Sequence, residues 1–174
     1  IADADEKKKK YLLAVQTRTK DLENLVNQLS SYNKMENHTF NYQKEQTDLK
    51  EFVREYLEDN EAFISEHGLD ILLSAEDDIK LVMDRGAFKR ILDNLLTNSI
   101  RYREKERSRI EIRIQKKEGR IIWSVADDGP GVEENCLEKI FESFCRLDAA
   151  RSHCSEGSGL GLAIVKRIVI DHQG

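Results

Sequence analysis

Hydrophobic residues near the start of the chain recur with the period of a helix. From Tyr11 to about Glu36 there is no glycine or proline, and one stripe of apolar residues repeats at spacings of three, four or seven: Val15, Leu22, Leu25, Leu29 and Tyr32. This pattern predicts a long amphipathic helix with a narrow, coiled-coil-like seam. Such a seam needs partner helices, so we expect a homodimer through this helix, or an upstream helix, to cover it.

Cap residues and short apolar runs predict the next elements. Asp48 with Glu51 forms a capping box that begins a helix reaching about Glu66, and Gly68 suits its end. The other predicted elements are strands at His38–Gln46, Leu69–Leu73 and Ile79–Met83, and a helix from Arg85 to about Arg103 with Asp84 as its cap.

Strict alternation then predicts a β-hairpin with one buried face. Isoleucines at positions 110, 112 and 114 alternate with polar residues, and after a turn at Gly119 the same rhythm continues through Ile121, Trp123 and Val125. The second strand ends at Asp127, so this carboxylate is expected at the rim of a sheet, where ligands commonly bind.

The last part of the chain predicts a flap between two helices. A short helix is expected at Leu137–Phe144, a polar flap at Arg146–Ser158, and a final helix from Leu160 onward. Together the elements predict an α/β fold: a two-layer sandwich of a mixed sheet with helices on one face, preceded by a long α-helix.

Composition limits the class of protein. A chain of 174 residues suits one core with an extension, because typical domains have about 100 to 150 residues. The net charge of −5 argues against a nucleic-acid partner, and no window approaches the roughly 18 apolar residues of a membrane span. Three cysteines without close pairing favour free thiols in a reducing, cytoplasmic setting.

The helix expected after Asp84 carries polar side chains suited to metal and phosphate. Asn94, Asn98 and Arg101 fall within an arc of about 60° on one edge of it. Amide oxygens can ligate Mg²⁺ and a guanidinium can offset phosphate charge. Taken alone, the asparagines could equally well face solvent.

The DDGPG turn at 127–131 suits a nucleobase. Gly129 and Gly131 allow close approach of the backbone, Pro130 stiffens the turn, and Asp127 presents an acceptor. A carboxylate accepts from the 6-amino group of adenine and repels the 6-oxo group of guanine, which favours ATP over GTP. By itself, the turn is more often an ordinary hairpin turn.

The GSGLGL segment at 157–162 suits phosphate. Its residues Gly157, Gly159, Leu160 and Gly161 lie at the start of a predicted helix, where free N–H groups and the helix dipole favour anions. No Gly-Lys-Ser/Thr follows, which excludes a P-loop.

These motifs together resemble the catalytic ATP-binding domain of sensor histidine kinases. ILDNLLTNSIRY at 91–102 resembles that family's asparagine box, VADDGPGV at 125–132 its first glycine box, IFESFCRLDAARS at 140–152 its phenylalanine box, and GSGLGLAIVK at 157–166 its second glycine box. The long helix resembles the second helix of the family's dimerisation domain. The resemblance divides the chain into a partial dimerisation domain at 1–38 and a catalytic domain at 39–174.

The resemblance implies the fold of gyrase- and chaperone-type ATPases, with ATP and Mg²⁺ as cofactors. It implies Asn94, Asn98 and Arg101 as catalytic residues, with the metal on Asn98 and Asn94. The other implied roles are nucleoside contact by Tyr102, adenine contact by Asp127, anchoring of the flap by Phe141 and Phe144, and its hinging by Gly157, Gly159 and Gly161.

The implied reaction is transfer of the γ-phosphoryl of ATP to a histidine, for relay to a response regulator. The family's acceptor histidine lies on a preceding helix, and the contexts of His38, His67, His153 and His172 do not match it. We therefore expect the chain to be inactive in autophosphorylation by itself, to lack the two strands that the family adds after the final helix, and to reach a membrane only through upstream segments. Two alternatives are a non-catalytic nucleotide-binding signalling module and a serine kinase on the same fold.

Overall fold

The computed structural model describes residues 2–146 and 158–174, and the chain divides into two compact units, Ile1–Phe40 and Asn41–Gly174. The first unit is one helix, α1 (Ala2–Glu36), which confirms the predicted long helix and begins nine residues before Tyr11. Its apolar seam is open, because the side chains of Leu22, Leu25 and Leu29 are all exposed. None of the described helices has an apolar stretch long enough to cross a membrane.

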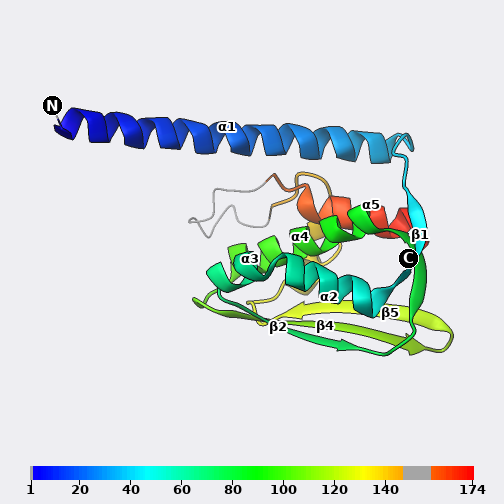
Figure 1. The fold of residues 1–174 in the computed structure, drawn as a ribbon. Helices are drawn as coiled ribbons and strands as arrows, with labels where there is room; N and C mark the ends of the chain where they lie inside the picture. Colours follow the sequence, from blue (N-terminus) through cyan, green and yellow to red (C-terminus); the bar gives the residue numbers. More distant parts are fainter. Residues whose placement is uncertain (1, 147–157) are drawn as a thin grey trace. The chain divides into compact units, whose positions relative to one another are not determined.

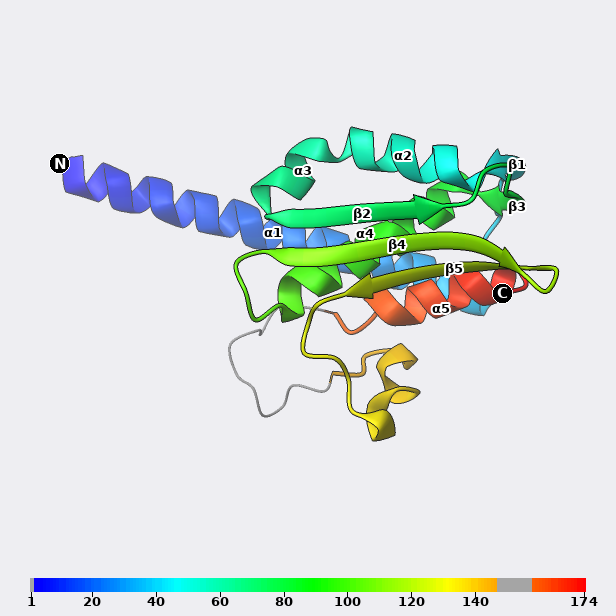
Figure 2. The same ribbon diagram turned by 90° about the horizontal axis from the view of Figure 1, so that it is seen from below.

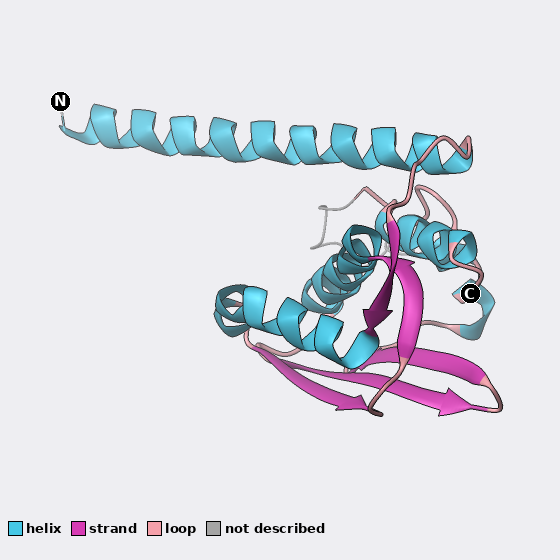
Figure 3. Ribbon diagram, turned by 45° about the vertical axis from the view of Figure 1, so that its right-hand side comes forward, coloured by secondary structure: helices cyan, strands magenta, loops and turns pink. Residues whose placement is uncertain are grey.

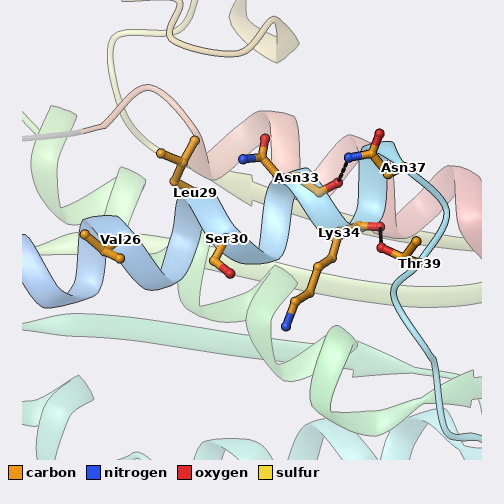
Figure 4. Close-up of a pocket in the computed structure, with 7 residues that line it drawn as sticks. All are labelled: Val26, Leu29, Ser30, Asn33, Lys34, Asn37 and Thr39. Atoms are coloured by element: carbon orange, nitrogen blue, oxygen red, sulfur yellow. Dashed lines mark hydrogen bonds between the residues drawn. The ribbon is translucent and has the colours of Figure 1, made fainter.

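The end of α1 carries a shallow hollow of about 400 Å³, drawn in Figure 4. The turn after the helix is closed by two side-chain bonds, from Asn37 Nδ2 to the Asn33 carbonyl and from Thr39 Oγ1 to the Lys34 carbonyl. The residues around the hollow belong to this unit alone: Val26, Leu29, Ser30, Asn33, Lys34, Asn37 and Thr39. None of them belongs to a predicted nucleotide motif.

The second unit contains the predicted mixed sheet (Figure 2). Its three strands are β2 (Leu69–Ala75), β4 (Ser108–Lys117) and β5 (Arg120–Asp127), in the order β2-β4-β5. β2 runs parallel to β4, and β4 pairs antiparallel with β5 as the predicted hairpin. A separate antiparallel pair joins β1 (Lys44–Asp48) to β3 (Lys80–Asp84).

The helices of this unit cover one face of the sheet, as predicted (Figures 1 and 3). They are α2 (Leu49–Asp59), α3 (Glu61–Glu66), α4 (Arg85–Tyr102) and α5 (Gly161–Asp171). The alternating isoleucines of β4, at positions 110, 112 and 114, are fully buried beneath them. The apolar faces of the helices supply the rest of the core, with Phe52, Leu92, Leu96, Ile164 and Ile168 almost completely buried.

Two predicted caps are confirmed, and two boundaries are wrong. Asp48 accepts from the Glu51 N–H at 3.1 Å, and Asp84 accepts from the Ala87 N–H at 2.8 Å. The helix expected to reach Glu66 breaks at Asn60, whose side-chain amide donates to the Tyr56 carbonyl and so ends α2 there. The strand expected from His38 begins only at Lys44, where pairing with β3 starts.

The short helix expected at Leu137–Phe144 is also wrong. The structure has two 3₁₀ turns there, η1 (Glu134–Cys136) and η2 (Lys139–Phe141). Phe144 lies beyond both, with a positive φ of 63° and a side chain that is 61% exposed. Its N–H donates to the Gly159 carbonyl at 2.9 Å, so the loop conformation follows the glycine segment rather than a helical repeat.

The end of α5 is held by residues just after the first unit and by the start of α4. The Tyr42 hydroxyl donates to the Asp171 carboxylate at 2.9 Å, and Lys44 Nζ donates to the Asp171 carbonyl at 2.7 Å. At the start of α4, the Asp84 N–H donates to His172 Nε2 at 3.2 Å. The Tyr42 and His172 rings meet edge to face with centroids 4.9 Å apart.

Candidate nucleotide-binding site

Helix α4 carries the first motif along the border of its buried face. The buried stripe is formed by Ala87, Phe88, Ile91, Leu92, Leu96 and Ser99. Asn94, Asn98 and Arg101 are half-buried beside this stripe, and Tyr102 is exposed at the last turn. The three side chains therefore share one edge of α4, as helical geometry predicted, and the two amides are neither fully buried nor fully exposed.

Asn94 brings the first and third motifs together. Its side-chain amide donates to the Arg90 carbonyl at 2.8 Å, which turns the amide oxygen away from its own helix backbone. That oxygen faces Gly161, the first residue of α5, because a Cβ built on Gly161 would lie 2.9 Å from it. A side chain at position 161 would therefore displace Asn94.

Asp127 brings the first and second motifs together. Its carboxylate accepts from the Ser99 hydroxyl at 3.0 Å and from the Gly129 N–H at 2.9 Å. A Cβ on Gly129 would lie 2.7 Å from Asp127 Oδ1, so a side chain there would displace the Asp127 carboxylate. Gly131 has a φ of +75°, a conformation that glycine adopts without strain.

The neighbouring Asp128 holds the same turn to the other side. Its carboxylate accepts from the Arg109 N–H at 2.9 Å and from Lys105 Nζ at 3.1 Å. The Arg109 N–H and the Lys105 ammonium hold the pKa of the Asp128 carboxyl below its usual value. Asp127 therefore faces α4 while Asp128 ties the turn to the start of β4, and the two adjacent acids have different surroundings.

The third motif enters α5 through a close backbone contact. Gly159 has a φ of +68°, and a Cβ there would lie 2.8 Å from the Phe144 backbone, so no side chain fits. The Leu160 side chain is buried in the core, and its N–H donates to the Ser158 hydroxyl at 3.2 Å. Gly157, together with most of the predicted flap, lies outside the described residues.

A metal site built from protein acids and thiols is not found in the described part of the chain. There, no three histidine, cysteine or carboxylate side chains come close enough to hold an ion. The half-buried amides of Asn94 and Asn98 are oxygen donors of the kind that hard cations accept beside substrate phosphates.

Ser99 and Asp128 are site residues that the motif reading left without a role. Ser99 follows Leu92 and Leu96 at helical spacings of four and three, and a hydroxyl on such an apolar stripe was the available signal. Asp128 offered no signal of its own, because its partners Lys105 and Arg109 lie about twenty residues earlier in the sequence.

Comparison with known proteins gives matches in both sequence and structure. The family model described as histidine kinase-, DNA gyrase B-, and HSP90-like ATPase matches residues 83–174. Sensor histidine kinase WalK of Bacillus subtilis (strain 168) is 28% identical over 166 residues, which cover 95% of this chain and 27% of that protein. Signal transduction histidine-protein kinase BaeS of Escherichia coli (strain K12) is 38% identical over 107 residues, covering 62% of this chain and 23% of that protein.

A solved structure extends the similarity to most of the chain. Full-length ShkA, crystallised in complex with AMPPNP, superposes with a TM-score of 0.77 at 26% identity, covering 93% of this chain and 33% of that one. The chain thus spans about a quarter to a third of the length of these relatives.

Proposed function

Because the chain belongs to the histidine kinase-, DNA gyrase B- and HSP90-like ATPase family, we propose that it is the ATP-binding catalytic portion of a sensor histidine kinase. One observation carries the proposal: three motifs far apart in the sequence meet through the Ser99–Asp127 hydrogen bond and the Asn94–Gly161 contact. The similarity to WalK and BaeS supports a sensor kinase within this family.

The nucleotide would lie between β5 and the edge of α4. Asp127 is exposed and would accept from the 6-amino group of adenine, with Tyr102 along the nucleoside. Gly129 and Gly131 would allow the base to approach the backbone. The AMPPNP complex of ShkA supports an adenine nucleotide as the ligand of this fold.

The triphosphate would lie toward the start of α5. The free N–H groups there and the Arg101 guanidinium would offset its charge. Asn98, with Asn94 beside it, would hold Mg²⁺ through amide oxygens. The cation supplies charge neutralisation for the phosphates when bound.

The proposed reaction transfers the γ-phosphoryl of ATP to a histidine nitrogen on an acceptor helix. The bond from the γ-phosphorus to the bridging oxygen breaks, ADP leaves, and a phosphorus–nitrogen bond forms. The residues of this chain would position the nucleotide and neutralise its charge. Asn94 stands one helical turn before Asn98, and an amide there is a poor base for water. Hydrolysis without an acceptor would therefore be slow.

The proposed partners follow from the same assignment. The exposed seam of α1 suits a second copy of the chain in a homodimer. A response regulator would receive the phosphoryl group from the histidine, and the reaction would take place in the cytoplasm, with membrane attachment through other segments. The net charge of −5 gives no reason for a nucleic-acid partner.

The test is phosphoryl transfer from γ-labelled Mg·ATP. The protein is incubated with an added acceptor-histidine domain, and we expect an acid-labile phosphoprotein to form. Asp127→Asn should lose most of the ATP binding and the transfer, since its amide presents donors as well as an acceptor. Asp70→Asn on the exposed side of β2 is the matched control. Rapid phosphate release without an acceptor would refute the kinase assignment.

A non-catalytic signalling module is the second candidate. The uncovered seam of α1 favours it, because dimerisation alone would explain that surface. Nucleotide binding without transfer to any acceptor domain would support the module over the kinase.

A further inference from the structure

Ser99 places a hydroxyl group inside an apolar helix face. Its side chain is 7% exposed, and it lies on the buried stripe of α4. The Ser99 oxygen is 3.0 Å from Asp127 Oδ2 on β5 and 3.1 Å from the Leu95 carbonyl on its own helix. Ser99 therefore links the core of the helix layer to the carboxylate proposed to read the base.

The Ser99 hydroxyl has one proton for these two acceptors. The Leu95 carbonyl already has a donor within the helix, since it lies four residues before the Ser99 backbone N–H. A carboxylate is also the stronger acceptor, because charge-assisted hydrogen bonds are about twice as strong as neutral ones. The proton is therefore assigned to Asp127.

This bond and one other fix the orientation of the Asp127 carboxylate. Ser99 engages Oδ2, and the Gly129 N–H engages Oδ1. A carboxylate has about four lone-pair sites, so about two remain on this exposed residue. These free sites can only accept. They suit an amino group and repel a carbonyl oxygen.

We propose that Ser99 is a positioning residue for purine specificity: it holds Asp127 so that the free lone pairs meet a 6-amino purine and exclude a 6-oxo purine. The inference rests on the proposed nucleotide function. In addition, the choice of base depends on the buried Ser99 hydroxyl, although this hydroxyl need not touch the ligand.

The test compares two nucleotides that differ only in the 6-amino group. Calorimetry measures binding of Mg·ATP and of the magnesium complex of purine riboside triphosphate, which has hydrogen at that position. We expect the unaltered protein to bind ATP at least about tenfold more tightly. Ser99→Ala should weaken ATP binding by about tenfold and change purine riboside triphosphate binding by less than about twofold. The reason is that the lost Ser99–Asp127 bond affects only the contact between Asp127 and the 6-amino group of the base.

Two further variants control for the helix and for the hydroxyl. Thr97 lies on the exposed side of α4 and its hydroxyl bonds to the Asp93 carbonyl, so Thr97→Ala should leave both affinities unchanged. Ser99→Thr keeps a hydroxyl at the site and should keep the preference for ATP.

The possible outcomes separate this inference from the function on which it rests. If the unaltered protein binds neither nucleotide, the proposed nucleotide site is wrong. If it binds both equally well, or if Ser99→Ala weakens both by the same factor, the site stands and the role of Ser99 in base selection is overturned. Loss of the ATP preference in Ser99→Thr would also overturn it.

Discussion

Replacing Gly161 by alanine should separate nucleotide binding from fold stability. The new Cβ would lie 2.9 Å from Asn94 Oδ1 and 3.6 Å from its Cγ, so the Asn94 side chain must rotate away. Rotation breaks its bond to the Arg90 carbonyl, at a cost of about 1 kcal/mol. Alanine in place of glycine stabilises a helix by up to about 1 kcal/mol. The free energy of unfolding should therefore change by less than about 1 kcal/mol.

Nucleotide affinity should respond much more strongly than stability. Displacing Asn94 removes a contact to metal or phosphate, and hydrogen bonds to charged groups are worth about 1.5 to 3 kcal/mol. We expect Gly161→Ala to raise the Kd for Mg·ATP by about ten- to a hundredfold in calorimetry.

Gly86→Ala is the matched control for Gly161→Ala. Gly86 lies in the first turn of α4, and a Cβ there would meet only the Asp84 carboxylate, at 3.3 Å. Its ATP affinity should stay within about twofold of the unaltered protein. An unchanged Kd in Gly161→Ala would refute the placement of Asn94 in the site, and equal losses in both variants would point to a general effect on the helices.

Three further changes test the packing around the site. Tyr56→Phe removes the hydroxyl that donates to the Asp93 carboxylate at 2.7 Å. Burial together with this bond raises the pKa of Tyr56 well above its usual value. Because a hydrogen bond to a charged group is lost, the free energy of unfolding should fall by about 2 kcal/mol in urea titrations. Ser108→Ala should instead raise the free energy of unfolding by about 1 kcal/mol, seen as a higher urea midpoint, because the buried Ser108 hydroxyl has no hydrogen-bond partner among the residues that the structure describes. Burial lowers the pKa of His172 below its usual 6.5, so the unfolded state takes up more protons and stability should fall as the pH drops below about 6.5. His172→Gln, whose side-chain oxygen can still accept from the Asp84 backbone N–H, should reduce the loss of stability between pH 7 and 5.5, and an equal loss would contradict this role.

The elements that could be predicted have strong periodicity or capping residues. The hairpin of β4 and β5 was readable because every second residue of β4 from Ser108 to Ile114 is buried. α4 was readable because Asp84 caps it and its apolar stripe is continuous. The likeness of the motifs to sensor histidine kinases, stated from the sequence, agrees with the family match over residues 83–174.

The elements that could not be predicted depend on tertiary contacts. A strand was predicted near β1, but β1 has one buried side chain, Thr47, so no alternation fixes where the strand begins or how it pairs with β3. The turns around Phe141 have no sustained apolar stripe, and their conformation is tied to Gly159 instead. The bond from Ser99 to Asp127 spans 28 residues, a separation at which local patterns carry no information. The roles of the individual site residues stay predictions until binding is measured.

The single tryptophan of the chain is a built-in optical probe of the sandwich. Trp123 lies on β5 with its ring 5.5 Å from the Phe88 ring and 6.2 Å from the Phe52 ring, and its indole nitrogen is buried. Its fluorescence emission therefore reports whether α2 and α4 remain packed against the sheet. Asp127 is four residues further along the same strand, about 13 Å away, so a change of emission on adding nucleotide would report a shift of α4 or β5 rather than direct contact with the base.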